Sequence, residues 1–252
     1  MRLLVSVRSA DEAVAAAEGG ADVIDAKEPA RGALGAVSPD VLREIRAATP
    51  PARLVTAALG DAHDETAIGR LAFEYSASGA ALVKVGFAAI ADVRRVERLI
   101  VACVRGCERG NPASGVVAVA YADAEHGTSI DATKLLAVAA HAGARGVLVD
   151  TADKEGAGLT TLWSRIELSA WVGRARGLKL IAAVAGKLGV DDLGRVRDAG
   201  ADVAGVRGAA CTGGRSGRVS ADLVRGLRTA SASRGDAQRR DERIARISRD
   251  RK

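Results

Sequence analysis

Aromatic residues, cysteines and histidines are scarce in this chain of 252 residues. Aromatic side chains make up 2% of it, which leaves no platform on which nucleic-acid bases could stack. The three cysteines, Cys103, Cys107 and Cys211, form no C-x-x-C pair, and their odd number does not suit a disulfide framework. The three histidines do not match the spacings of zinc sites. We therefore expect no specific nucleic-acid partner, no metal and no other cofactor.

The sequence also lacks a long hydrophobic run. No apolar stretch reaches about 18 residues, the length at which a transmembrane helix becomes a candidate. The segment Met1–Val7 is too short to be the hydrophobic part of a secretory signal and runs straight into a charged segment. These absences predict a cytoplasmic protein that does not enter a membrane.

Positive charge is concentrated at one end of the chain. The net charge is +6, but residues 231–252 hold eight basic and four acidic side chains, a net of +4, which leaves +2 for residues 1–230. We expect residues 1–230 to form one catalytic domain that is nearly neutral. Residues 231–252 are predicted to be a basic tail, disordered or loosely helical, whose contacts with polyanions would be nonspecific.

Short apolar runs alternate with alanine-rich amphipathic segments along residues 1–230. The runs are continuously apolar, which is typical of a parallel sheet buried on both faces. Ser9-Ala10-Asp11-Glu12 matches a capping box, and Ser38-Pro39 places a serine cap and a first-turn proline before another helix. Eight strand–helix units predict an α/β fold, a single-domain (β/α)₈ TIM barrel. The predicted strands are Leu3–Val7, Asp22–Lys27, Leu54–Leu59, Leu82–Phe87, Val116–Tyr121, Gly146–Thr151, Leu180–Ala185 and Asp202–Arg207.

An internal repeat supports the barrel. A glycine–alanine pair precedes every even-numbered strand, with spacings of 59, 64 and 57 residues between the glycines Gly20, Gly79, Gly143 and Gly200. Glycine is expected where a helix ends. Side chains five and seven residues after each glycine share one face of the strand. Those positions should meet at the C-terminal mouth of the barrel, where barrel enzymes have their active sites, and they include Asp25, Lys27, Lys84, Asp150 and Arg207.

Lysine is rare in this chain, with seven lysines against 30 arginines. Four of the seven lie at or just after predicted strand ends: Lys27, Lys84, Lys154 and Lys187. Unlike arginine, lysine can lose its proton, and the neutral amine forms Schiff bases with carbonyl compounds. Burial and a neighbouring cation both lower the pKa of an amine. Two interpretations stay open: catalytic amines, or ion pairs of Lys27 with Asp25 and Lys84 with Asp150 that close the barrel.

Glycines and basic residues follow the last two predicted strands. Loops at this place often bind phosphate in TIM barrels, because glycines let backbone N–H groups approach an anion. We expect substrate phosphate to be bound here, and the candidates are Gly186, Lys187, Arg207, Gly208, Gly213, Gly214 and Arg215. A flexible loop without a ligand is the alternative. Asp123 and Glu125 could add carboxylates to the same rim, and a weak magnesium site there is a further possibility.

Several motifs resemble one known family. They are Met1–Ser6, Gly19–Lys27, Gly32-Ala33-Leu34-Gly35-Ala36, Val83-Lys84-Val85-Gly86, Tyr121-Ala122-Asp123-Ala124 and Gly205–Cys211. Over about residues 1–230 the chain resembles the (5-formylfuran-3-yl)methyl phosphate synthases, also called 4-(hydroxymethyl)-2-furancarboxaldehyde phosphate synthases. The resemblance implies a TIM-barrel lyase that joins two molecules of glyceraldehyde 3-phosphate into a furan phosphate, losing one phosphate and water. It implies a role in methanofuran biosynthesis or in the one-carbon metabolism of methylotrophic bacteria, and we also expect a homo-oligomer.

The resemblance also implies roles for individual residues. Lys27 matches the Schiff-base lysine of the family, and Lys84 matches its proton-abstracting lysine. Asp25, Asp150 and Lys154 match further polar positions of the site. The segment Glu28-Pro29-Ala30-Arg31-Gly32 departs from the family, which tends to have an Asn-Pro pair there.

Two other functions remain open from the sequence. One is another Schiff-base enzyme, such as a class I aldolase or a thiamine- or pyridoxine-pathway barrel, acting on a phosphorylated carbonyl compound. The other is a non-catalytic barrel that binds a phosphorylated metabolite and uses its basic tail to contact RNA or a partner protein.

Overall fold

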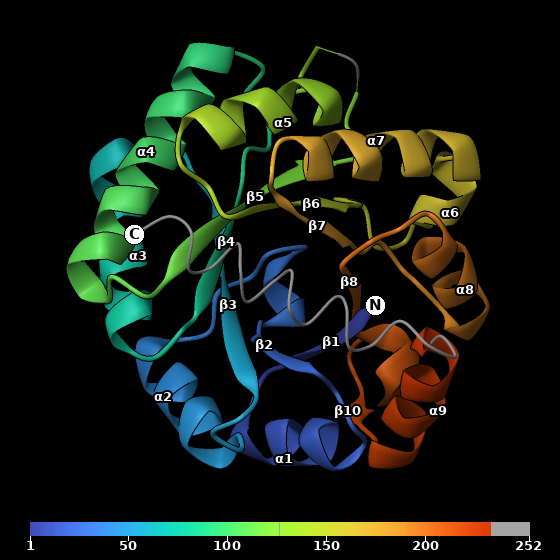
Figure 1. The fold of residues 1–252 in the computed structure, drawn as a ribbon. Coiled ribbons are helices and arrows are strands. Elements are labelled where there is room, and N and C mark those ends of the chain that lie inside the picture. Colours follow the sequence, from blue (N-terminus) through green and yellow to red (C-terminus); the bar gives the residue numbers. More distant parts are fainter. Residues whose placement is uncertain (126, 233–252) are drawn as a thin grey trace.

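The computed structural model of the protein describes residues 1–125 and 127–232. The barrel strands are β1 (Arg2–Val7), β2 (Val23–Ala26), β3 (Leu54–Asp61), β4 (Leu82–Gly86), β5 (Gly115–Tyr121), β6 (Gly146–Asp150), β7 (Ile181–Val184) and β8 (Val203–Val206). All are parallel to their neighbours, and they follow chain order around a closed barrel (Figure 1). The predicted (β/α)₈ fold is confirmed, and every strand end lies within two residues of its predicted position.

Helices surround the barrel on all sides (Figure 1). They are α1 (Ala10–Glu18), α2 (Pro39–Ala48), α3 (Glu65–Ala77), α4 (Val93–Gly110), α5 (Ala132–His141), α6 (Leu159–Leu162), α7 (Arg165–Gly177), α8 (Val190–Asp198) and α9 (Ala221–Ser231). A short hairpin of β9 (Cys211–Thr212) and β10 (Arg218–Val219), which the sequence did not predict, precedes α9. Residues 233–252, most of the predicted tail, lie outside the described residues, so the division of the chain at residue 230 stays a prediction.

The repeated glycines end four helices in the same way. Gly20, Gly79, Gly143 and Gly200 all have positive φ, between 84° and 101°. In each case the N–H group of the following alanine donates to the carbonyl oxygen five residues earlier, as Ala21 does to Ala16. This is the Schellman arrangement, and glycine adopts its left-handed conformation without a steric cost. The motif turns each helix into the next even strand, so the predicted repeat is confirmed as a structural one.

The two predicted helix starts differ in outcome. Ser38 caps α2 by accepting a hydrogen bond from the N–H group of Val41 at 3.3 Å, as expected. Ser9 caps α1 through the N–H group of Glu12 at 3.4 Å, but the Glu12 carboxylate does not bond back to Ser9. It accepts instead from the N–H group of Arg8 and from the guanidinium of Arg207. The predicted capping box is therefore only half formed, because Glu12 has a charged partner inside the barrel.

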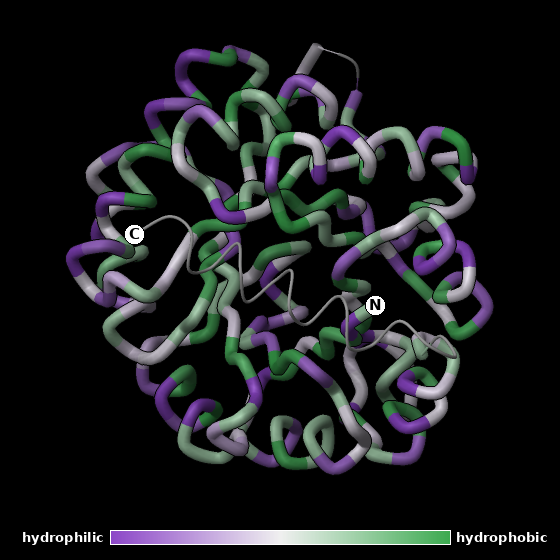
Figure 2. Tube along the Cα trace, viewed as in Figure 1, coloured by the Kyte–Doolittle hydropathy of each residue, from purple (hydrophilic) through white to green (hydrophobic). Residues whose placement is uncertain are grey.

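Hydrophobic residues fill the layer between the strands and the helices. Figure 2 shows strands that are largely hydrophobic, and helices whose hydrophilic residues lie mainly on the outer turns. A second cluster, Leu34, Ala58, Val117, Val119, Tyr121 and Leu148, packs inside the barrel, mainly from β3, β5, β6 and the loop after β2. Within the described part of the chain, no helix is both long enough and apolar enough to cross a bilayer. Two members of this cluster, Val117 and Leu148, also line a cavity in the barrel interior.

Candidate active site

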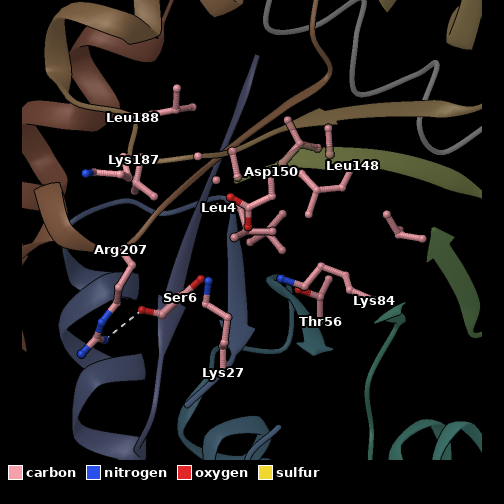
Figure 3. A pocket seen from close by; sticks show the side chains of 18 of the residues that line it. Leu4, Ser6, Lys27, Thr56, Lys84, Leu148, Asp150, Lys187, Leu188 and Arg207 are labelled. Atoms are coloured by element: carbon pink, nitrogen blue, oxygen red, sulfur yellow. Dashed lines mark hydrogen bonds between the residues drawn. The ribbon is translucent and has the colours of Figure 1, made fainter. Parts of the chain in front are cut away.

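A cavity of about 350 Å³ lies at the carboxyl ends of the strands and extends through the barrel interior to residues at their amino ends, such as Arg2, Leu54 and Leu82. Lys27 directly after β2, Lys84 in the middle of β4 and Asp150 at the end of β6 point into it (Figure 3). Lys154, Arg207 and Arg215 also line it, and Asp25 lies buried directly behind the lining. The structure therefore brings together the polar residues that the repeat placed at the barrel mouth.

Asp25 and Lys84 form a buried ion pair. The Lys84 amine lies 2.6 Å from a carboxylate oxygen of Asp25, which is fully buried. The strand register places Ser6 of β1 and Thr56 of β3 beside Asp25, and their hydroxyls donate to its carboxylate at 2.8 and 2.7 Å. This pairing differs from the pairings considered from the sequence, which joined Lys84 to Asp150 and Lys27 to Asp25. The barrel stagger explains the difference, because it brings the Lys84 side chain of β4 toward β2.

Lys27 is the buried amine without a partner. Its residue is 6% exposed, and no other described residue forms a hydrogen bond or ion pair with its Nζ atom. Burial lowers the pKa of this amine from 10.5 to about 7. The carboxylate of Asp150 opposes that shift, whereas the cation of Lys84 adds to it. A large fraction of Lys27 is therefore neutral near pH 7, which is the form that attacks a carbonyl carbon.

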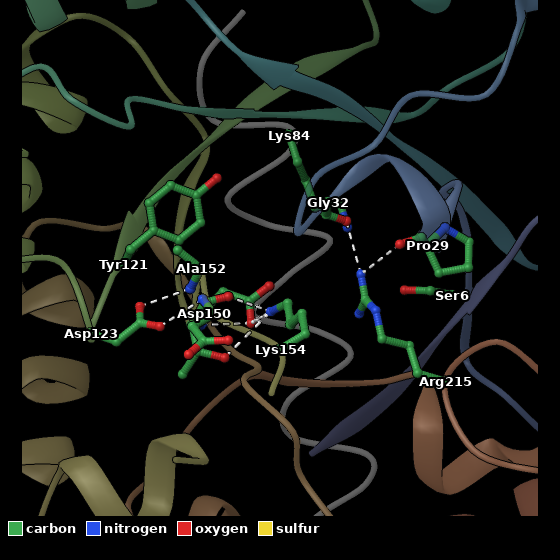
Figure 4. Close-up of polar contacts among 12 residues, drawn as sticks. Ser6, Pro29, Gly32, Lys84, Tyr121, Asp123, Asp150, Ala152, Lys154 and Arg215 are labelled. Atoms are coloured by element: carbon green, nitrogen blue, oxygen red, sulfur yellow. Dashed lines mark hydrogen bonds and ion pairs between the residues drawn. The ribbon is translucent and has the colours of Figure 1, made fainter. Parts of the chain in front are cut away.

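Asp150 and Lys154 form a second pair at the opposite wall. The Lys154 amine donates to Asp150 at 2.7 Å and also to the carbonyl oxygen of Thr151 (Figure 4). Burial raises the pKa of the Asp150 carboxyl, but the charges of Lys154 and Lys27 outweigh burial and hold the pKa below its ordinary value. The Asp150 carboxylate therefore stays ionised near pH 7.

Arg207 has a different position from the one expected for a phosphate ligand. It bonds to both carboxylate oxygens of Glu12 and to the carbonyl oxygens of Ser6 (Figure 3), Arg215 and Gly217. These bonds use all five N–H groups of a guanidinium. Burial raises the pKa of Glu12, but the hydrogen bonds from Arg207 and smaller effects outweigh burial. The pKa of Glu12 is therefore below its usual range. Arg207 therefore fixes the loop after β8, and it has no donor left for a substrate.

Arg215 is the cation that this loop presents to the cavity. Its Nη2 donates to the carbonyl oxygens of Pro29 at 3.2 Å and Gly32 at 2.8 Å, in the loop that follows Lys27 (Figure 4). Its Nη1 and Nε have no acceptor among the described residues. Arg215 thus bridges the loops after β8 and β2 and keeps free donors beside the cavity.

The glycine-rich loops divide into two groups. Gly186, Gly189 and Gly208 line the cavity, next to the first turn of α8. In the described part of the chain, the backbone N–H groups of Lys187, Leu188, Gly208 and Ala209 have no acceptor, so they could bind an anion. The Lys187 amine turns away to the carbonyl oxygens of Glu155 and Gly156. Gly213 and Gly214, with φ of 79° and 78°, lie in the turn of the β9–β10 hairpin and do not line this cavity.

Asp123 stabilises the loop that carries Lys154. Its two carboxylate oxygens accept from the N–H groups of Ala152 at 2.7 Å and Asp153 at 2.8 Å (Figure 4). Glu125 is exposed and does not line the cavity. The described residues contain no group of three His, Cys, Asp or Glu side chains that could hold a metal ion. Asp123 therefore has a structural task that the sequence did not reveal.

Sequence reasoning also missed Ser6, Thr56 and Glu12 as parts of the site. Ser6 and Thr56 are polar residues at inward positions of mainly apolar strands, a signal that was present in the sequence. Their shared contact with Asp25 depends on strand register, which the sequence does not state. Glu12 carried a helix-cap signal, and its bond to Arg207 joins residues 195 positions apart.

These observations define a (β/α)₈-barrel protein with buried amines and carboxylates around one cavity at its strand ends. A family model described as 4-HFC-P synthase matches residues 3–228. A (5-formylfuran-3-yl)methyl phosphate synthase of Methanothermobacter thermautotrophicus is 38% identical over 90% of this chain and 98% of its own length. One of Methanopyrus kandleri is 39% identical over 92% and 99%. The chain belongs to the 4-HFC-P synthase family, and its relatives' names indicate an enzyme, a synthase.

Solved structures with the same fold are more distant in sequence. A 3-hexulose-6-phosphate synthase superposes with a TM-score of 0.63 at 23% identity, covering 92% of this chain and all of that one. A phosphoribosyl anthranilate isomerase of Thermus thermophilus gives a TM-score of 0.60 at 14% identity, over 91% of this chain and 98% of that one. At these identities the two structures support the barrel fold alone.

Proposed function

We propose that this protein condenses two molecules of glyceraldehyde 3-phosphate into (5-formylfuran-3-yl)methyl phosphate, through a Schiff base on Lys27. The product would serve the biosynthesis of methanofuran or of a related one-carbon cofactor. The relatives' printed names support the product. The observation that carries the chemistry is Lys27, a buried amine without a partner among the described residues, whose pKa is lowered to about 7.

The overall reaction balances without a second reagent. Two triose phosphates combine, and one inorganic phosphate and two molecules of water leave, which gives one furan that keeps one phosphate. No electron acceptor or donor is needed, because the hydroxyl and carbonyl groups of the trioses supply both the ring oxygen and the formyl group. Glyceraldehyde 3-phosphate alone should therefore be sufficient as substrate.

The first steps would take place at Lys27 and Lys84. Neutral Lys27 attacks the carbonyl carbon of one triose, water leaves, and the resulting iminium withdraws electrons from the neighbouring carbon. Lys84 would remove the proton from that carbon while it passes the proton of its ion pair to Asp25, so that the Asp25 carboxylate is the net proton acceptor. Ser6 and Thr56 hold Asp25 in place for this exchange. General acid–base catalysis of this type typically contributes ~10²–10⁴-fold to a rate.

The later steps would involve the opposite wall. The enamine attacks the aldehyde carbon of the second triose, and the Lys154–Asp150 pair would protonate the oxygen that becomes a hydroxyl. One phosphate leaves by β-elimination, and loss of water completes the aromatic ring. Arg215 and the free N–H groups beside Gly186 and Gly208 would bind the retained phosphate.

A covalent trap tests the proposal. Borohydride added with glyceraldehyde 3-phosphate should reduce the iminium and attach a triose to Lys27, which peptide mass spectrometry would locate. Lys27→Ala should give no adduct, and Lys134→Ala, which removes an exposed lysine of α5, should give the wild-type yield. An unmodified wild-type protein, or an adduct that persists in Lys27→Ala, would refute the Schiff base.

Product analysis separates this function from the two alternatives. An aldolase-type barrel uses the same amine chemistry but needs a different carbonyl partner, so it would form no furan from glyceraldehyde 3-phosphate alone. A non-catalytic barrel would form no product at all. Removal of residues 233–252 leaves α9 whole, and we expect turnover to survive this deletion. The non-catalytic alternative predicts the opposite result. Under it the full chain shows no turnover, and its binding to RNA or a partner protein disappears with the tail.

A further inference from the structure

The barrel interior differs between its two sides. On the side of β3 and β5, Leu34, Ala58, Val119 and Tyr121 pack against one another. On the side of β7 and β8, the branched Ile181 and Val203 line the cavity at the starts of the two strands, and the small residues Ala183, Ala185 and Gly205 line it further along them. These small residues leave space between themselves and the larger Leu4 and Leu148. TIM barrels are normally filled by bulky branched side chains at such positions. We call the part of the cavity lined by Leu4, Leu148, Ala183, Ala185 and Gly205 the hollow side. It is open because Ala183, Ala185 and Gly205 are small.

At Gly205, the limited room around the Cα atom favours a small residue, whereas the backbone conformation does not require glycine. Its φ is not among the positive values of the described residues, so other residues could adopt its conformation. An added Cβ atom would lie 3.3 Å from the Cβ of Ala185 and 3.5 Å from a terminal methyl of Leu4. The distance to Leu4 is an ordinary van der Waals contact, whereas the distance to Ala185 is tight and requires a small shift of that residue. A larger residue here would fill the cavity and would not break the strand.

The hollow side is apolar, and its side chains offer no hydrogen bond. A triose phosphate carries hydroxyl groups, and burying a hydroxyl without a partner is unfavourable. A furan ring has lost those hydroxyls, and its flat apolar surface gains from contact with Leu4 and Leu148. The hollow side thus suits the ring and disfavours the acyclic substrate.

We propose that the hollow side is the binding site of the furan ring as it forms, and that it favours the dehydrated ring over acyclic sugar phosphates. This inference rests on the proposed function. Lys27, Asp150, Gly186 and Gly208 line the same cavity, so a ring on the hollow side would share it with the amine, the carboxylate and the proposed phosphate-binding loops. Binding of the ring there stabilises the dehydrated ring more than the acyclic reactants, so it shifts the equilibrium of the bound dehydration step toward the furan.

Equilibrium binding of two phosphate esters tests the proposal without any covalent step. Furfuryl phosphate has a furan ring and no aldehyde, whereas glycerol 3-phosphate has the same charge and two hydroxyls. Isothermal titration of the wild type should show at least about tenfold tighter binding of furfuryl phosphate. Ala183→Val fills the hollow side and should remove that preference, while glycerol 3-phosphate still binds. Ala47→Val, on an exposed face of α2, should keep the preference.

The outcomes distinguish this inference from the proposed function. Equal affinities of the two esters in the wild type, or a preference that survives in Ala183→Val, would overturn the inference whether or not Lys27 forms a Schiff base. A missing borohydride adduct on Lys27 would refute the proposed function and leave the binding preference as a separate result. If Ala183→Val does not fold, Gly205→Ala provides the smaller filling, with a partial loss of the preference expected.

Discussion

The two amine–carboxylate pairs lie on opposite walls of the barrel and differ in how firmly they are held. Asp25 and Lys84 join β2 and β4, and three donors within 2.8 Å fix the Asp25 carboxylate. Asp150 and Lys154 lie at β6, four strands from β2 around the barrel, and the Lys154 side chain is 12% exposed at the mouth. Asp25 and Lys84, the inner pair, are a fixed part of the barrel core. Asp150 and Lys154, the outer pair, can exchange protons with solvent.

This comparison explains why Lys27, between the two walls, is the nucleophile of the proposed mechanism. Lys84 and Lys154 each have a carboxylate partner within 2.7 Å. Lys27 is as buried as Lys84 and has no such bond among the described residues, and its pKa is lowered to about 7. The absence of a bonded carboxylate therefore distinguishes Lys27 from the equally buried Lys84.

The largest effect should come from Lys27→Arg. Arginine keeps the positive charge but does not lose its proton, so it cannot form a Schiff base. We expect furan formation to fall by ~10⁴-fold or more, the upper end for a single catalytic group. Ultraviolet absorbance of the furan product measures this rate. Lys134→Arg is the matched exposed control, and a Lys27→Arg enzyme with substantial turnover would contradict the assignment.

The next effect contrasts the two carboxylates in stability. Asp25→Asn leaves the Lys84 amine buried without a counter-charge, which typically costs ~3–5 kcal/mol of unfolding free energy. Asp150→Asn should cost clearly less, because Lys154 can turn toward solvent. Urea denaturation at pH 7 compares the two variants. Equal losses would show that the inner pair is no more tightly built than the outer one.

The charges of the two walls should shift the pKa of Lys27 in opposite directions. Lys84→Gln removes a neighbouring cation and leaves the Asp25 carboxylate, so the pKa of Lys27 should rise. Asp150→Asn removes a neighbouring anion, so this pKa should fall. In the wild type, the rate of adduct trapping with cyanoborohydride should increase with pH through about 7, as the amine loses its proton. Midpoints that move together in the two variants would contradict this account.

The smallest effect is expected in the hairpin outside the cavity. Gly213→Ala places a side chain at φ 79°, which costs ~1–2 kcal/mol of stability for a residue other than glycine. The kinetic constants for glyceraldehyde 3-phosphate should stay within twofold, because Gly213 does not line the cavity. A large increase in KM would restore the sequence-based expectation that Gly213 binds phosphate.

The sequence predicted the features that repeat locally. The glycine–alanine pairs and the apolar runs gave the barrel, its strand ends and the face that carries Lys27, Lys84 and Asp150. The pairing of Lys84 with Asp25 and the bond between Arg207 and Glu12 were not predicted. Both depend on the stagger of strands around the closed barrel, which joins residues far apart in the chain. The small residues on β7 and β8 were visible in the sequence. The cavity beside them could not be predicted, because it also depends on which residues fill the rest of the barrel interior.

The most direct test of the account is a titration of the Lys27 amine itself. The protein can be labelled with ¹³C and ¹⁵N in lysine, and the Lys27 signal can be assigned by its loss in Lys27→Arg. The Cε and Nζ chemical shifts, followed from pH 5 to 11, report the protonation of this side chain alone. The account predicts a midpoint near pH 7. A midpoint near 10.5, the ordinary value for lysine, would contradict it.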